Sequence, residues 1–106
     1  MDESEFEARA AAALEAVERA LEAAAIAEAD WELKEGGILE VEFDDGSKVI
    51  VNRHGAAREI WVAARSGGFH FRWDGAAWRD TRSGEELFAA LSEIVSRQLG
   101  RRVRLG

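Results

Sequence analysis

Apolar and polar residues alternate with a period of two through the middle of the chain, and this alternation constrains the fold more than any other feature. Every second residue is apolar in Leu39–Phe43 and again in Phe69–Trp73. Such alternation is typical of β-strands with one buried face and one solvated face. Turn-forming pairs, among them Gly36-Gly37 and Asp45-Gly46, separate the segments, so consecutive strands are predicted to pair as antiparallel hairpins. Residues 53–58 are predicted to form an irregular stretch between two of the strands.

Two segments with a helical period flank the strands. Residues 3–27 carry apolar side chains at three- and four-residue steps, and Ser4, or Asp2 before it, can cap their start. The segment 83–86 matches a capping box with Ser83 as the first residue, and Gly100 ends the second apolar stripe. The predicted fold is α+β, a two-layer α/β sandwich with two helices packed on one face of a five- or six-stranded antiparallel sheet. Val103 and Leu105 are expected to pack back on the helices.

The length of 106 residues fits one domain that spans residues 1–106. No apolar run approaches the roughly 18 residues of a membrane span, and the acidic N-terminus lacks the pattern of a signal peptide, so we expect a cytoplasmic protein. The absence of Cys excludes disulfides and Cys-ligated clusters within this chain, and two His are too few for a three-His zinc site.

Charge is divided unevenly between the two halves of the chain. Residues 1–50 carry fifteen acids and four bases, a balance of −11, whereas residues 51–106 carry six acids and ten bases, a balance of +4. Such polarity favours a basic partner on the acidic side and argues against general binding of nucleic acid. Membrane partners are not expected either, because no apolar run is long enough to span a bilayer.

The alternation also predicts what the solvated face of the sheet displays. Trp61 is assigned to this face, beside Asn52 and His70, on a surface that runs from acidic at the first strands to basic at the last. A Trp with polar neighbours on a solvated face has the composition of a partner-binding hot spot. The alternative interpretation is that Trp61 merely covers Ile50 and Ala63 on the surface.

Acidic residues also cluster on the first helix and the first strand. Glu15, Glu18 and Glu22 share one helix face, and Asp30 and Glu32 follow on the strand. Hard cations prefer carboxylate oxygens, so an open ridge of this kind can bind them weakly. The alternative is a solvated face that keeps the chain soluble and guards an edge strand. Motifs for nucleophilic, phosphate-binding and zinc-hydrolase chemistry are missing, so no catalytic residue is predicted.

Three segments, taken in order, resemble the bacterial frataxin (CyaY) family: residues 43–53, 60–71 and 80–88. Ser4-Glu5-Phe6 fits the same family, and the resemblance covers nearly the whole chain. It implies a non-enzymatic regulator of iron–sulfur cluster assembly that binds iron (Fe²⁺ or Fe³⁺) weakly. The implied partners are the cysteine desulfurase and the iron–sulfur scaffold protein, and the implied state is a monomer, with iron-driven oligomers left open.

The resemblance also assigns roles to residues. It implies an acidic ridge that binds iron and meets a basic patch on the desulfurase, and a sheet face centred on Trp61 that meets the scaffold complex. The predicted metal ligands are Glu15, Glu18, Glu22, Glu28, Asp30 and Glu32. The predicted partner-binding residues are Glu18, Glu22, Asn52, Trp61 and His70. The sequence departs from the family pattern at two places. The segment His54-Gly55-Ala56 stands where Gln-x-Pro is common, and Glu59 stands where Gln is common.

Two other functions stay open at this point. The ridge could oxidise ferrous iron or store it in oligomers, although sparse carboxylates and the lack of His there disfavour a redox centre. The chain could also be an interaction module whose binding does not depend on metal.

Overall fold

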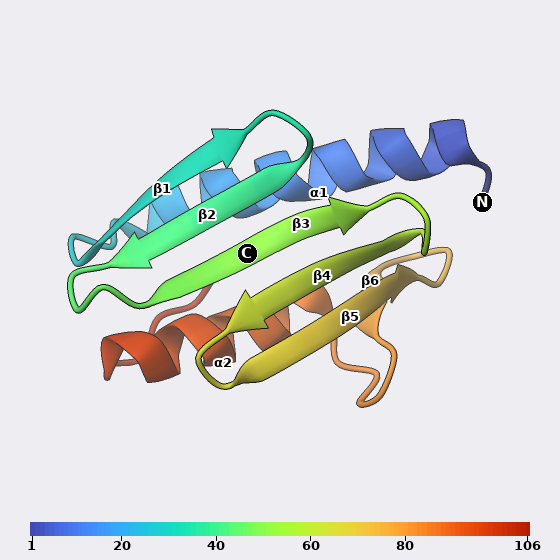
Figure 1. Cartoon of the computed structure of the whole chain (residues 1–106). Helices are drawn as coiled ribbons and strands as arrows, with labels where there is room; N and C mark the ends of the chain where they lie inside the picture. Colours follow the sequence, from blue (N-terminus) through green and yellow to red (C-terminus); the bar gives the residue numbers. More distant parts are fainter.

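Two helices and six strands make up the computed structural model, which describes residues 1–106 (Figure 1). The elements are α1 Glu3–Ala24, β1 Ala29–Lys34, β2 Ile38–Phe43, β3 Lys48–His54, β4 Glu59–Ala64, β5 Gly67–Trp73, β6 Trp78–Asp80 and α2 Leu87–Leu99. The strands form one antiparallel sheet, and their order across the sheet follows their order along the chain. The predicted fold class is confirmed, with six strands.

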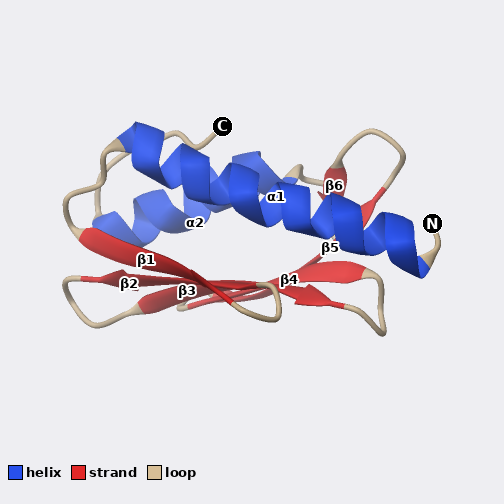
Figure 2. Cartoon of the chain, turned by 90° about the horizontal axis from the view of Figure 1, so that it is seen from above, coloured by secondary structure: helices blue, strands red, loops and turns tan.

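Both helices cover one face of the sheet and leave the other face open (Figure 2). The strand alternation produces this division, since Val49, Val51, Ile60, Val62 and Phe71 are all buried on the helical side. They belong to a core of 24 buried apolar residues. No buried side-chain nitrogen or oxygen lacks a hydrogen-bond partner. The apolar side chains of the strands thus face the helices, and the polar side chains of the same strands face the open side.

The first helix begins where the sequence indicates and ends earlier than predicted. The Asp2 side chain caps α1 by accepting a hydrogen bond from the backbone N–H of Glu5 at 2.8 Å. The helix ends at Ala24, three residues before the predicted end, because Ala25 adopts a left-handed conformation with φ of 52°. The chain then turns so that Ile26 is buried in the core. Neither helix combines the length and hydrophobicity that a bilayer span requires.

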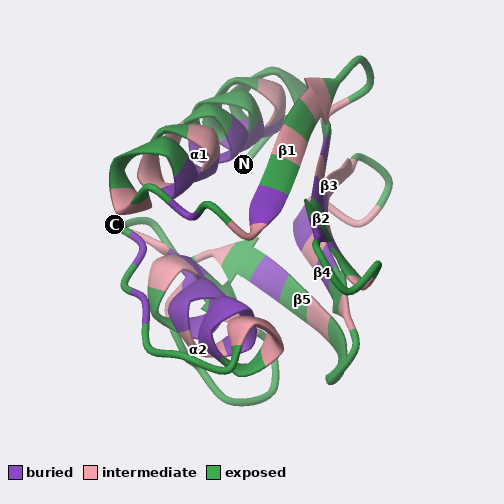
Figure 3. Cartoon of the chain, turned by 90° about the vertical axis from the view of Figure 1, so that its left-hand side faces the viewer, coloured by how far each residue is buried: buried purple, intermediate pink, exposed green.

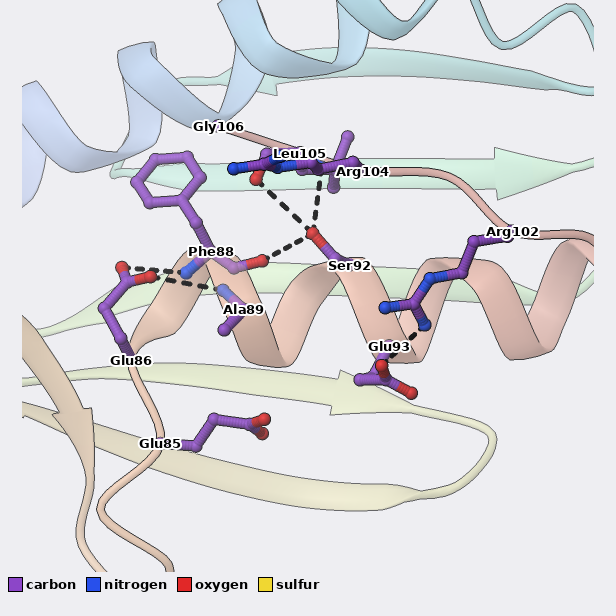
Figure 4. A pocket seen from close by; sticks show the side chains of 10 residues that line it. All are labelled: Glu85, Glu86, Phe88, Ala89, Ser92, Glu93, Arg102, Arg104, Leu105 and Gly106. Carbon is purple, nitrogen blue, oxygen red and sulfur yellow. Dashed lines mark hydrogen bonds and ion pairs between the residues drawn. The ribbon is translucent and has the colours of Figure 1, made fainter.

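The predicted capping box at the start of the second helix is wrong. Ser83 lies in a turn, where its backbone N–H donates to the Asp80 carboxylate at 3.1 Å. Glu86 is the capping residue instead, and its carboxylate accepts hydrogen bonds from the backbone N–H groups of Phe88 and Ala89 (Figure 4). The Asp80 carboxylate and backbone carbonyl take the N–H groups of residues 82–84, so this segment forms a turn and the helix starts later than the sequence motif predicts. Gly100 ends the helix, as predicted.

The C-terminal tail packs back on the helices, as predicted. Val103 and Leu105 are buried, and the tail runs between the two helices on the side away from the sheet (Figure 3). Two serines of α2 hold its backbone: the Oγ of Ser96 accepts from the Val103 N–H at 3.0 Å, and the Oγ of Ser92 accepts from the Leu105 N–H at 2.8 Å. The tail thus closes the groove between the helices.

The third strand is longer than the sequence analysis predicts. The irregular stretch predicted for residues 53–58 is wrong at its start, because β3 runs to His54 and pairs with the start of β4, where His54 lies opposite Glu59. Only residues 55–58 form the turn between these strands. The extension matters because it places His54 and Glu59 on the open face, in the same alternation as Asn52 and Trp61.

Candidate functional site

Three aromatic rings from three neighbouring strands stack on the open face of the sheet. The ring of Trp61 on β4 lies between the imidazoles of His54 on β3 and His70 on β5. The centroids are 3.7 Å apart for His54 and Trp61, with an interplanar angle of 12°, and 4.5 Å apart for Trp61 and His70, with an angle of 9°. His70 lies directly opposite Trp61 in the register, whereas His54 lies on the diagonal, opposite Glu59. The nearly parallel rings therefore follow one another across the three strands. We call these three residues the ring stack.

A buried carboxylate lies next to the ring stack. Glu59 accepts a hydrogen bond from the indole Nε1 of Trp61 at 2.8 Å and another from the Nε of Arg72 at 2.6 Å. Its Oε1 also lies 3.6 Å from the Nδ1 of His70. The Glu59 side chain is only 7% exposed, although it belongs to the solvated face of the sheet. The ring stack and Arg72 are thus tied together through one side chain.

The ionisation of Glu59 reflects two opposing effects. Burial raises the pKa of a carboxyl group, whereas the hydrogen bonds from Trp61 and Arg72 and the positive charge of Arg72 lower it. The net result is a pKa of Glu59 below its usual value, so the group is a carboxylate at neutral pH. A charged acceptor forms stronger hydrogen bonds than a neutral one, which favours a fixed position for the indole.

The imidazole of His54 is held by the turn that follows β3. The Nδ1 of His54 accepts a hydrogen bond from the backbone N–H of Ala57 at 3.2 Å. In a neutral imidazole this bond assigns the remaining proton to Nε2. Asn52, two residues before His54 on the same strand, lies opposite Trp61 in the register, and its side-chain amide donates to the backbone oxygen of Arg53 at 3.3 Å. Imidazole, indole and amide groups therefore form one continuous polar surface.

Acidic residues from the first two strands occupy the other side of the open face. Asp30 lies opposite Glu42, and Glu32 lies opposite Glu40, around a shallow depression of about 230 Å³. Of these four acids only Glu40 makes direct ion pairs, since Lys34 and Lys48 each donate to it at 3.0 Å. These bonds lower the pKa of Glu40. The two lysines do not balance the four acids, so this side of the open face keeps a negative charge. Like charges that face each other across strands are unfavourable in the free protein.

The residues of the acidic ridge, Glu15, Glu18, Glu22, Glu28, Asp30 and Glu32, do not converge on one point. The three helix acids belong to the helical layer and make no ion pair, whereas Asp30 and Glu32 belong to the open face of the sheet. No group of three or more His, Asp or Glu side chains has an arrangement that could enclose a metal ion. The ridge is a set of separate carboxylates on an exposed surface.

Glu28 of the ridge has a partner of its own. Its two carboxylate oxygens accept from the Nε and Nη2 of Arg101, both at 2.8 Å. These hydrogen bonds are the main reason that the pKa of Glu28 falls to about 2. The ion pair joins the segment before β1 to the segment after α2. A metal ion at Glu28 would have to compete with Arg101.

Replacing Glu28 with Gln is expected to reduce the acid sensitivity of the fold. The folded-state pKa of Glu28 lies below its value in the unfolded chain, so its contribution to stability is present above the ordinary pKa and is lost as pH falls towards 2. Urea unfolding at several pH values between 6 and 2 should give a smaller decrease for the variant than for the wild type. Glu85, which makes no ion pair, provides the matched control Glu85→Gln. Parallel stability curves for wild type and Glu28→Gln would contradict this role.

The structure brings together part of the predicted site and adds two residues to it. Asn52, Trp61 and His70 meet on the open face as expected. His54 and Glu59 were not assigned a role, although each lies two residues along a strand from a predicted partner-binding residue. The alternation, continued through the supposed loop, would have placed both on the same face.

Comparisons with known proteins agree with one another. A model of the frataxin-like domain matches residues 1–101. The iron–sulfur cluster assembly protein CyaY of Dechloromonas aromatica is 59% identical over 105 residues, and the match covers 99% of each chain. The protein of the same name from Cupriavidus pinatubonensis is 54% identical, with 100% of this chain and 97% of the relative covered.

Solved structures show the same architecture. The frataxin of Psychromonas ingrahamii superposes with a TM-score of 0.88 at 30% sequence identity, covering 98% of this chain and 97% of that one. The trimeric frataxin of the yeast Saccharomyces cerevisiae, in its ferrous complex, superposes with a TM-score of 0.67 at 24% identity, covering 95% and 88%. The second likeness supports the fold alone.

Proposed function

Since this chain belongs to the bacterial CyaY branch of the frataxin family, a group of non-enzymatic proteins of iron–sulfur cluster assembly, we propose that it regulates this assembly by docking on the machinery. Residues 1–106 act as one domain in this proposal. The partners are the cysteine desulfurase and the scaffold protein, and the chain acts as a monomer that carries iron weakly. The observation that carries the proposal is the open sheet face, where the ring stack adjoins an unbalanced acidic surface.

The acidic ridge is proposed to meet a basic patch on the desulfurase. Glu15, Glu18 and Glu22 make no ion pair within the chain, so their charges are available to a partner. Repeated like charges on one helix face are unfavourable in the free protein. A basic partner relieves this repulsion, and the attraction also accelerates encounter at low salt.

Iron is proposed to bind the same carboxylates. Exposed carboxylate oxygens suit a hard cation, and an open arrangement supports only weak binding with little selectivity. The ion is cargo or signal here and is not turned over. Because the metal and the desulfurase use the same charges, iron on the ridge would tune docking.

Replacing Glu18 and Glu22 together with Ala is expected to weaken binding to the cognate desulfurase roughly tenfold at low salt, because two charges of the proposed interface are lost. Titration calorimetry at two salt concentrations measures the affinity. Glu3→Ala with Glu85→Ala removes the same charge from exposed sites outside the ridge and serves as the control. Equal affinities for the ridge variant and the wild type would remove the ridge from the interface.

The same double variant tests the iron claim. In an anaerobic ¹⁵N–¹H NMR titration with ferrous iron, wild-type signals of Glu15–Glu22 and Asp30–Glu32 should broaden selectively, and those of the double variant should broaden less. Calcium serves as the control for non-selective binding. The absence of localised change at millimolar ferrous iron would leave docking by charge alone, without a metal.

A further inference from the structure

From the contacts around the ring stack we infer that Glu59 is the positioning residue of the docking surface: it fixes the Trp61 indole on edge between two imidazoles. This inference rests on the proposed docking function and adds the residue that orders the docking surface. The partner then meets the edges of three stacked rings, because both faces of the indole are already covered within the chain.

Glu59 is placed where the fold itself does not need a charge. It is the one ionisable residue among the buried ones, and yet it lies on the solvated face of the sheet and not in the apolar core. Enclosing a carboxylate is costly unless hydrogen bonds satisfy it. Trp61 and Arg72 supply those bonds at 2.8 and 2.6 Å. The enclosure of Glu59 is therefore a property of the docking surface, built by the residues of that surface.

The contacts of Glu59 restrict the indole in two ways. The bond from Nε1 fixes the rotation of the ring in its plane, and the flanking imidazoles fix the ring plane itself. Arg72 is mostly exposed, and its Nε bond to Glu59 holds the base of its guanidinium beside His70. A side chain that is already ordered loses less conformational entropy on binding. Without Glu59, the indole nitrogen has no acceptor in the chain, and the ring stack loosens.

Two substitutions separate the acceptor role from the charge. Glu59→Ala removes both and is expected to weaken docking on the cognate desulfurase–scaffold complex about three- to tenfold, the range set by ordering one or two side chains. Glu59→Gln keeps a side-chain oxygen for the indole and should recover most of the affinity. The indole ¹H–¹⁵N signal of Trp61 gives an independent readout, since it should shift and broaden in Glu59→Ala and return towards the wild-type position in Glu59→Gln.

A double-variant cycle with Trp61→Ala tests whether Glu59 acts through the indole. In the Trp61→Ala background, Glu59→Ala should change docking by less than about twofold, because the indole through which Glu59 acts is gone. If the two substitutions reduce affinity independently, or if Glu59→Ala leaves the indole signal and the affinity unchanged, the inference is overturned. If Glu59→Ala does not fold, Glu59→Met, which keeps the length of the side chain but has no oxygen acceptor, carries the cycle. A docking loss that is equal with and without Trp61 then overturns the inference as well. Failure of the wild type to bind the complex would instead refute the proposed function, while the indole signal would still report on Glu59.

Discussion

Replacing Leu105 with Ala is expected to lower the free energy of unfolding by about 2–5 kcal/mol, the usual range for deleting most of a buried leucine side chain. Leu105 is only 3% exposed and belongs to the tail after α2, which runs between the two helices (Figure 3). Chain ends usually contribute little to stability. Here the last residues complete the helical layer.

The reason lies in how the tail is held. Ser92 accepts the Leu105 N–H and donates to the Phe88 carbonyl oxygen at 2.7 Å, so the tail backbone is satisfied without a partner strand (Figure 4). The Leu105 side chain is thereby directed into the core, where a smaller residue leaves a cavity. Urea unfolding followed by circular dichroism measures the change. Arg104→Ala, at an exposed neighbour, should be close to neutral, and equal stability of Leu105→Ala and wild type would contradict the packing of the tail.

Trp61→Ala is expected to weaken docking on the desulfurase–scaffold complex at least tenfold, with only a small change in melting temperature. Aromatic anchors at interface centres typically contribute about 2 kcal/mol or more to binding. Trp61 lies on the open face, outside the apolar core, so its removal should leave the fold intact. This combination distinguishes a docking residue from a packing residue.

Trp73 provides the matched control. It is also half-buried, but it packs against the core and contacts Trp78, with ring centroids 5.7 Å apart. Trp73→Ala should therefore lower the melting temperature and leave docking near the wild-type value once the protein is folded. A large drop in melting temperature for Trp61→Ala, without a selective loss of docking, would show that Trp61 serves the fold instead.

Most of the fold follows from local patterns in the sequence. The period-two segments place Val49, Ile60 and Phe71 on one face of the sheet and Trp61 on the other, and short turns leave only a meander of hairpins. The errors lie at element ends, where neighbours compete for the same backbone groups. Ser83 matches a capping motif, but the Asp80 carboxylate takes its N–H, and Glu86 caps the helix.

The site was predictable only in part, for a physical reason. The placement of Trp61, Asn52 and His70 on the open face follows from strand parity, which is a local property. The Glu28–Arg101 pair joins residues 73 positions apart, and no local pattern signals it. Glu59 shows the same limit, because a strand pattern places a Glu on the solvated face but does not indicate that Trp61 and Arg72 enclose it.

Whether this chain acts on cluster assembly is tested most directly by the rate of cluster formation itself. The cognate desulfurase and scaffold are supplied anaerobically with cysteine and ferrous iron, and cluster absorbance is followed as the chain is added. We expect the wild type and Trp73→Ala to change the initial rate in proportion to their concentration, and Trp61→Ala and the Glu18/Glu22 double variant to change it much less. An initial rate that stays constant with the wild type in molar excess over the desulfurase would contradict the account.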